Sequence, residues 1–253
     1  MNTDKHNSPI ENLVSVVVAT KNSERSIEAC IRSAIEQTVK PEILVIDGQS
    51  SDSTLAILGQ FRHNISRIVS EPDSGIYDAL NKGVRLASGK FLYILGSDDC
   101  LASNDALGEL LSAGDSDIIF GDVYTKNING KVAVSRSLPL NNFKYRMPFS
   151  HQGVLVKRDL LLQHPFGNSP ASDYRFLFSM YLSKRHFKGT ETIVAYYSLG
   201  GYSDKNQLIS TIDRLAINFD LRGIQATDVV FFYSYHILRS LLRHLFRKLL
   251  QQS

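Results

Sequence analysis

Short apolar runs and helical apolar periodicities alternate along the first hundred residues of the chain. Four short runs are predicted to be strands, and the first and the last have the mostly apolar character of strands that are buried in a parallel sheet. The four runs lie at residues 13–20, 42–46, 67–70 and 91–95. Between them, apolar residues recur at spacings of three and four, which predicts amphipathic helices. Strands that alternate with helices predict an α/β fold with a doubly wound, mostly parallel central sheet.

Polar groups follow each predicted strand at its carboxyl end. They are the segment 20–22, Asp47, Asp73 and the pair Asp98-Asp99. Each loop alone has a simpler interpretation, because Asp and Asn suit turns and caps. In doubly wound sheets, however, ligands bind outside the carboxyl ends of the strands. Four polar loops at one edge therefore favour a binding crevice.

The pair Asp98-Asp99 points to a metal ion. Two adjacent carboxylates repel each other and gain little from lying at a strand end. A hard divalent cation such as Mg²⁺ or Mn²⁺ takes oxygen ligands and commonly bridges carboxylates to substrate phosphates. Gly96 and Ser97 leave room for such a ligand. The predicted cofactor is a divalent metal, Mn²⁺ or Mg²⁺, that holds a diphosphate.

Composition limits the classes of partner and compartment. The 253 residues are 43% hydrophobic and 21% charged, as in an ordinary globular protein, and the net charge of +3 is too small to indicate nucleic acid. Cys30 and Cys100 lack disulfide or zinc spacing, which favours a reduced cytosolic protein. The polar stretch 1–12 does not read as a signal peptide, and no apolar stretch reaches the ~18–20 residues that span a bilayer.

The order of the motifs resembles the family 2 glycosyltransferases of the GT-A fold. In the first half these motifs are VSVVVATKN, VIDGQSSDST, SEPDSGIYDALNKGVRLASGK and LGSDD. In the second half they are SHQGVLVKRDLL, ASDYRFLFSMYL and YYSLGGYS. In pattern they are similar to bacterial transferases of colanic-acid, O-antigen and exopolysaccharide assembly. The resemblance covers roughly residues 13–203, with a nucleotide-sugar-binding half at 13–100 and an acceptor and catalytic half at 101–203. A polar tail at 1–12 and C-terminal helices at 204–253 flank this domain.

The resemblance implies roles for residues on the donor side. Residues near the nucleotide base and ribose are Thr20 and Asn22, together with Asp47, which resembles the acid that pairs with the uracil edge. The segment that flanks the sugar and the diphosphate contains Asp73, Asn81 and Lys82. Tyr77 in the same segment is interpreted as a packing residue.

The resemblance also implies the metal site and the base. Asp98 and Asp99 occupy the DxD-type motif, with Gly96 in place of its commonest first Asp. The metal site therefore rests on Asp98 and Asp99, with Asp99 as the favoured ligand and a solvent-accessible acid. Asp173 resembles the catalytic base of the family, although an acid at a helix start is also favoured by the helix dipole. His151 and Gln152 are similar to a pair near the donor sugar or the acceptor.

These residues predict an inverting glycosyltransferase. A metal would neutralise the leaving diphosphate and Asp173 would deprotonate the acceptor hydroxyl. The expected donor is a UDP-sugar, carrying a hexosyl or N-acetylhexosaminyl group, and the expected acceptor is a glycan or lipid-linked oligosaccharide. Two alternatives are a sugar-1-phosphate nucleotidyltransferase and a non-catalytic nucleotide-sugar binder. A nucleotidyltransferase would be expected to have a glycine-rich phosphate loop after the first strand, but the loop 20–24 contains no glycine. The oligomeric state is not predicted.

The C-terminal segment predicts a helix with two faces. Apolar residues fall on one face of the stretch HILRSLLRHLFRKLL, and Arg239, Arg243 and Arg247 fall on the other. No acid follows Asp228. A terminal helix packed on the domain would give the same pattern. The clustered cations favour an interfacial helix on the anionic inner face of the cytoplasmic membrane, and therefore a peripheral cytoplasmic protein.

Overall fold

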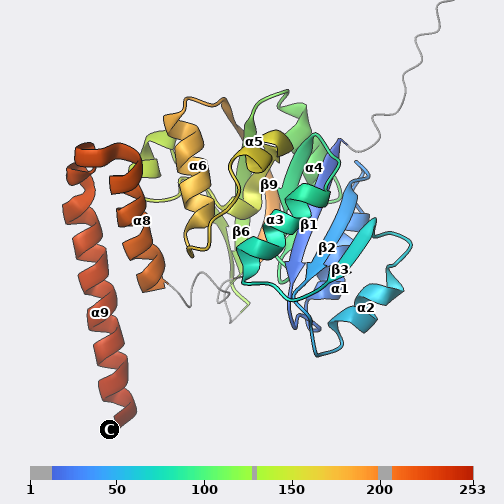
Figure 1. Ribbon diagram of the computed structural model, residues 1–253, viewed down its shortest axis with the longest axis horizontal. Helices are drawn as coiled ribbons and strands as arrows, with labels where there is room; N and C mark the ends of the chain where they lie inside the picture. The colour runs from blue at the N-terminus through green and yellow to red at the C-terminus, as the bar shows by residue number, and fades with distance from the viewer. Residues whose placement is uncertain (1–12, 127–129, 199–206, 253) are drawn as a thin grey trace, which may run out of the picture.

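The first half of the protein folds as the alternating pattern predicts. The computed structural model describes residues 13–126, 130–198 and 207–252, so the predicted tail and the end of the predicted domain at 199–203 lie outside it. Four parallel strands lie side by side in the order β3-β2-β1-β4, and a helix connects each to the next along the chain (Figure 1). Their bounds are β1 Val14–Thr20, α1 Ile27–Ile35, β2 Glu42–Asp47, α2 Thr54–Gln60, β3 Arg67–Ser70, α3 Ile76–Leu86 and β4 Phe91–Ile94.

The second half extends the same sheet with mixed pairings. β8 runs antiparallel between β4 and β6, whereas β9 is parallel to β6, and the full order is β3-β2-β1-β4-β8-β6-β9-β5 with β7 on β6. The elements are β5 Cys100–Leu101, α4 Ala106–Ser112, β6 Ile118–Lys126, β7 Val132–Ser135, η1 Leu140–Lys144, η2 His151–Gly153, β8 Val154–Lys157, α5 Arg158–Gln163, α6 Ser172–Leu182 and β9 Phe187–Ser198. The antiparallel insertion of β8 places η2 beside the carboxyl end of β4.

Alternate residues of β1 pack into opposite layers. Val16 and Val18 belong to the core formed with α1 and α4, and Val17 belongs to the core formed with α3, α5 and α6. Helix α3 lies very close to the sheet, because a Cβ on Gly83 would come within 2.3 Å of Val17 Cγ1. Burial on both faces accounts for the consecutive valines at 16, 17 and 18 in β1.

The C-terminal helices form a hairpin beside α6 (Figure 1). They are α8 Gln207–Arg222, the 3-10 helix η3 Gly223–Val229 and α9 Val230–Gln252. Asn218 donates hydrogen bonds to the hydroxyls of Tyr174 (3.0 Å) and Tyr233 (3.3 Å), and Tyr233 is only 1% exposed. This buried network fixes the start of α9 to the domain, and further along the helix Leu238 is 57% exposed. Within the described part of the chain, the helices are too short or too polar to cross a bilayer.

Candidate active site

A polar cavity of about 760 Å³ opens at the carboxyl ends of the first parallel strands. It brings together four of the predicted site residues, which are Thr20, Asn22, Asp73 and Asp98. Lys21, Arg25 and Asp52 also line it. The rule that ligands bind at this edge of a doubly wound sheet is therefore met by a cavity of sufficient size for a nucleotide.

Asn22, which lines this cavity, has an unusual backbone conformation. Its φ is 52°, a left-handed conformation that Asn tolerates better than most residues. Its side-chain Oδ1 accepts a hydrogen bond of 2.8 Å from Ser51 N, and its own N–H donates to Ser50 Oγ at 2.8 Å. Asn22 thus holds the loop after β1 against the loop after β2.

Asp47 is fully buried and bound by serines. Its carboxylate accepts hydrogen bonds from Ser50 N at 3.0 Å, from Ser70 Oγ at 2.6 Å and from Ser50 Oγ. Among the described residues that line the polar cavity, Asp47 is absent. The structure thus shows Asp47 as a brace between the loops after β2 and β3, and its role at the uracil edge stays a prediction.

Asn81 and Lys82 on α3 make contacts within the protein. Asn81 clamps the backbone of Phe166, donating to its carbonyl at 2.8 Å and accepting from its N–H at 3.0 Å. Lys82 Nζ lies 3.0 Å from Glu71 and 3.4 Å from Asp78, and it donates to Pro72 O at 2.9 Å. Both residues hold α3 in place, and neither belongs to the described lining of the polar cavity.

The two adjacent carboxylates have different environments. Asp98 is exposed in the polar cavity, whereas Asp99 is only 2% exposed, so the expectation of a solvent-accessible acid is wrong for Asp99. Burial raises the pKa of Asp99 from 3.8 to about 7, with the charge of Asp98 adding to the rise. A hydrogen bond of 2.7 Å from Ser198 N to Asp99 Oδ1 opposes it. A buried acid with a raised pKa gains most from a nearby cation.

Gly96 marks the point at which these groups converge. A Cβ at this position would lie 2.4 Å from Asp99 Oδ2, 3.2 Å from Asp98 Oδ1 and 3.0 Å from Gln152 Nε2. A larger side chain at position 96 would therefore have to displace the Asp99 carboxylate from the position that it has here.

The carboxylate pair fits a divalent cation only in part. Among the described residues, no group of three or more His, Cys, Asp and Glu side chains could hold a metal ion. Asp99 Oδ2 and Asp98 Oδ1 nevertheless lie near each other, at 2.4 and 3.2 Å from the position that a Cβ on Gly96 would take. Mg²⁺ and Mn²⁺ sites commonly combine one or two carboxylates with substrate phosphates. The donor set therefore fits a metal that arrives with a diphosphate.

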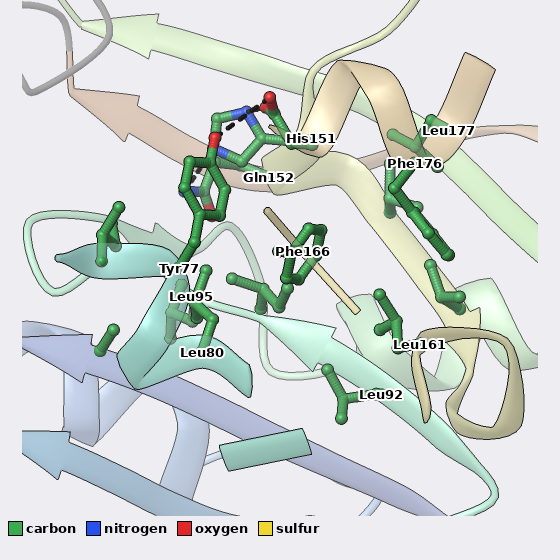
Figure 2. A pocket seen from close by; sticks show the side chains of 16 residues that line it. Tyr77, Leu80, Leu92, Leu95, His151, Gln152, Leu161, Phe166, Phe176 and Leu177 are labelled. Carbon is green, nitrogen blue, oxygen red and sulfur yellow. Dashed lines mark hydrogen bonds and ion pairs between the residues drawn. The ribbon is translucent and has the colours of Figure 1, made fainter. Parts of the chain in front are cut away.

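Asp173 lies in the first turn of α6, and its side chain is 23% exposed. Its Oδ1 accepts hydrogen bonds from the Tyr77 hydroxyl at 3.2 Å and from Tyr174 N at 2.8 Å, and its Oδ2 lies 3.4 Å from His151 Nδ1. Figure 2 shows His151 and Gln152 beside Tyr77 at one end of an apolar cavity. Tyr77 was expected only to pack, but its hydroxyl joins α3 to the predicted base.

Gln152 connects the region of the predicted base to the loop that carries the carboxylate pair. Its Oε1 accepts a hydrogen bond of 3.3 Å from Gly96 N, and its Nε2 lies 3.2 Å from His151 Nε2. Gln152 is 4% exposed, so this link is internal. The structure thus connects Gly96, in the loop of the carboxylate pair, through Gln152 and His151 to Asp173, and these residues come from three separate places in the sequence.

Curated relatives of this chain are glycosyltransferases. A PGL/p-HBAD biosynthesis glycosyltransferase of Mycobacterium bovis (strain BCG / Pasteur 1173P2) is 32% identical over 156 residues, which cover 58% of this chain and 60% of that protein. Chondroitin synthase of Escherichia coli is 36% identical over 120 residues, which cover 46% of this chain and 17% of that protein. The chain thus matches about three fifths of the mycobacterial relative.

Solved structures confirm the expected GT-A fold. TarS residues 1–349 from S. aureus, in complex with UDP-GlcNAc, align with a TM-score of 0.64 at 20% identity over 84% of this chain and 69% of that one. A mannosyltransferase from Pyrobaculum calidifontis, in complex with GDP-Man and Mn²⁺, aligns with a TM-score of 0.64 at 17% identity over 86% of this chain and 69% of that one.

The family described as glycosyl transferase family 2 matches residues 15–168. The matched segment is more than half of the chain and contains the polar strand ends, the carboxylate pair and the His151-Gln152 pair. It stops shortly before Asp173. With the motifs, the site and the fold in agreement, this chain belongs to glycosyl transferase family 2.

Proposed function

We propose that this protein is an inverting glycosyltransferase of bacterial surface polysaccharide synthesis, such as O-antigen assembly. It would move a hexosyl or N-acetylhexosaminyl group from a nucleotide-diphosphate donor, expected to be a UDP-sugar, to a glycan or lipid-linked acceptor. The observation that carries this proposal is the series of contacts from the backbone of Gly96, in the loop of the carboxylate pair, through Gln152 and His151 to Asp173. It joins a site for a leaving diphosphate to a carboxylate that can accept a proton.

The residues divide the reaction between the two sides of the sugar. The polar cavity would bind the nucleotide, and Asp98 and Asp99 would hold a divalent metal that neutralises the leaving diphosphate. Asp173 would accept the proton of the acceptor hydroxyl as it attacks. A single base on the acceptor side favours direct displacement and inversion. The complexes of relatives with UDP-GlcNAc and with GDP-Man and Mn²⁺ support this assignment.

Nucleotide release tests the proposal against its two alternatives. The purified chain is incubated with a panel of UDP- and GDP-sugars, Mn²⁺ and lipid-linked oligosaccharide. Free nucleoside diphosphate and an NMR-detected new linkage are expected. Pyrophosphate chemistry would instead indicate a nucleotidyltransferase, and donor binding with neither product would indicate a non-catalytic binder.

Removing the Tyr77 hydroxyl should slow the reaction without changing donor binding. Tyr77→Phe removes the hydrogen bond that holds Asp173 Oδ1 in place. We expect kcat to fall by roughly three- to tenfold, the usual range for one such bond, with the donor KM nearly constant. Tyr196→Phe on β9, where Tyr196 is 38% exposed, is the control. An unchanged kcat would leave Tyr77 as a packing residue.

The exposed part of α9 supports a membrane-surface location. Phe231, Tyr235, Leu238 and Leu242 recur at helical spacings and are 86%, 55%, 57% and 57% exposed. The sequence of the same helix also contains clustered arginines and no acid. We therefore propose that α9 lies on an anionic bilayer surface, with apolar side chains in the interface and cations at the headgroups.

Vesicle sedimentation tests this location. Full-length protein should pellet with phosphatidylglycerol-containing vesicles at low salt and be partly released at high salt. Leu238→Glu/Leu242→Glu should weaken binding by roughly tenfold or more, because it replaces apolar contacts by charges that anionic lipid repels. Leu55→Glu/Leu162→Glu changes two exposed leucines on α2 and α5 and is the matched control. Point changes are preferable to deletion from residue 229, because Tyr233 is part of the buried network. If wild-type protein does not bind the vesicles, the alternative of a terminal helix that belongs only to the domain would be favoured.

A further inference from the structure

An apolar cavity lies between the sheet and the helices of the catalytic half. Figure 2 shows the side chains that line it, and its volume is about 100 Å³. Side chains from α3, β4, β8, α5 and α6 form its wall, and these include Leu80, Leu92, Val156, Leu161, Phe176 and Leu177. All six are buried. Polar groups occur at one end, where Tyr77, His151 and Asp173 meet.

A cavity of this kind suits an apolar occupant. Protein interiors are close-packed and hold few voids larger than a water molecule. Its wall offers few polar partners for ordered water, and an engineered apolar cavity of about 150 Å³ stays dry and binds benzene. A space of about 100 Å³ is therefore in the range that takes an aryl ring or a short alkyl group.

The position of the cavity relative to the base identifies the occupant. The apolar and polar cavities adjoin, because Ala19 and Ile76 line both. Asp173 lines the apolar cavity and is absent from the described lining of the polar one. A hydroxyl bound by Asp173 thus belongs to a molecule that can extend into the apolar space, and in the proposed reaction that molecule is the acceptor.

We infer that the acceptor carries an aryl or short alkyl group close to its attacking hydroxyl, and that this group fills the apolar cavity. The inference rests on the proposed function, because it takes Asp173 as the base on the acceptor side. The inference restricts the acceptor to compounds in which an apolar group lies next to the attacking hydroxyl, such as aryl or alkyl glycosides. A wholly polar glycan would leave the cavity empty.

Binding of benzyl alcohol tests the inference without any donor. The probe combines a ring for the cavity with a hydroxyl for Asp173. In methyl NMR spectra of the full chain, saturable shifts are expected for Leu80, Leu92, Leu161 and Leu177, and the exposed Leu55 should not shift. Absent or non-saturable shifts would overturn the inference, whatever the nucleotide-release assay shows. Conversely, failed sugar transfer with intact benzyl alcohol binding would count against the proposed function alone.

Two variants and one competition experiment test whether benzyl alcohol binds in the apolar cavity. Leu161→Phe should fill the cavity and weaken binding of the probe by at least about tenfold, whereas Leu162→Phe, at the adjacent exposed position, should not. If Leu161→Phe does not fold, Val156→Ile adds one methylene to the same space and should weaken binding by roughly threefold, with the exposed Val132→Ile as control. Folded variants that bind like wild type would overturn the inference. Displacement of the probe by UDP-GlcNAc with Mn²⁺ would also overturn it, by assigning the cavity to the donor sugar.

Discussion

Replacing Asp173 with asparagine should reduce turnover by about 10²–10⁴-fold, the range associated with loss of a general base. Asparagine keeps the size of the side chain and an oxygen that can accept from Tyr77 and from Tyr174 N. It cannot accept the proton of the attacking hydroxyl. Asp173 lies apart from the polar cavity, so donor affinity should remain nearly constant.

The measurement combines single-turnover kinetics with calorimetric titration of the donor. Asp220→Asn is the matched control, because Asp220 also contacts α6, through an exposed ion pair of 2.6 Å with Arg175. Near-normal turnover in Asp173→Asn would move the base elsewhere. Asp122 would be the next candidate, although its carboxylate is already engaged by Arg136 at 2.9 Å and by Ser137 N at 2.7 Å.

The arrangement of the first half could be predicted from sequence because its signals are local. The continuous valine run of β1 reflects burial on both faces, and helical spacing identified α1 and α3. Knowing that parallel strands end at one edge was enough to place Thr20, Asp73 and Asp98 around one cavity. These inferences needed periodicity and one topological rule, and no long-range contact.

The details that periodicity does not encode depend on contacts between distant residues. Tyr77 meets Asp173 across 96 positions, and Ser198 N meets Asp99 across 99 positions. Neither pairing leaves a local pattern, so the sequence predicts only packing for Tyr77 and a solvent-accessible acid at Asp99. The resemblance likewise placed Asn81 and Lys82 near the donor, whereas the structure shows both bound to protein groups. The family motif thus predicts the region of the site, and tertiary packing decides what each side chain in that region contacts.

Replacing Asp99 with asparagine should abolish metal-dependent transfer and make the metal-free protein more stable above neutral pH. Burial raises the folded-state pKa of Asp99 to about 7, against 3.8 as its ordinary value. The folded state therefore binds more protons than the unfolded state between these values. The stability linked to this group is fully present below pH 4 and is lost as the pH rises toward 7. With about 1.4 kcal/mol per pKa unit, the loss is on the order of 4 kcal/mol.

Urea unfolding of metal-free protein between pH 5 and 8 measures this effect. The free energy of unfolding of the wild type should fall with rising pH more steeply than that of Asp99→Asn. Asp98→Asn removes the same charge from the exposed neighbour and is the matched control, with a smaller effect on both stability and transfer. Equal pH slopes in wild type and Asp99→Asn would contradict the buried, proton-binding acid.

Adding Mn²⁺ separates a metal ligand from a merely buried acid. A cation beside Asp99 favours its charged form, so Mn²⁺ with UDP should restore stability to the wild type at pH 8 and should do little for Asp99→Asn. Transfer that survives both asparagine substitutions and EDTA would disprove the metal site. In that case the carboxylate pair would have to act on the donor through hydrogen bonds, with the raised pKa of Asp99 allowing that acid to donate one near neutral pH.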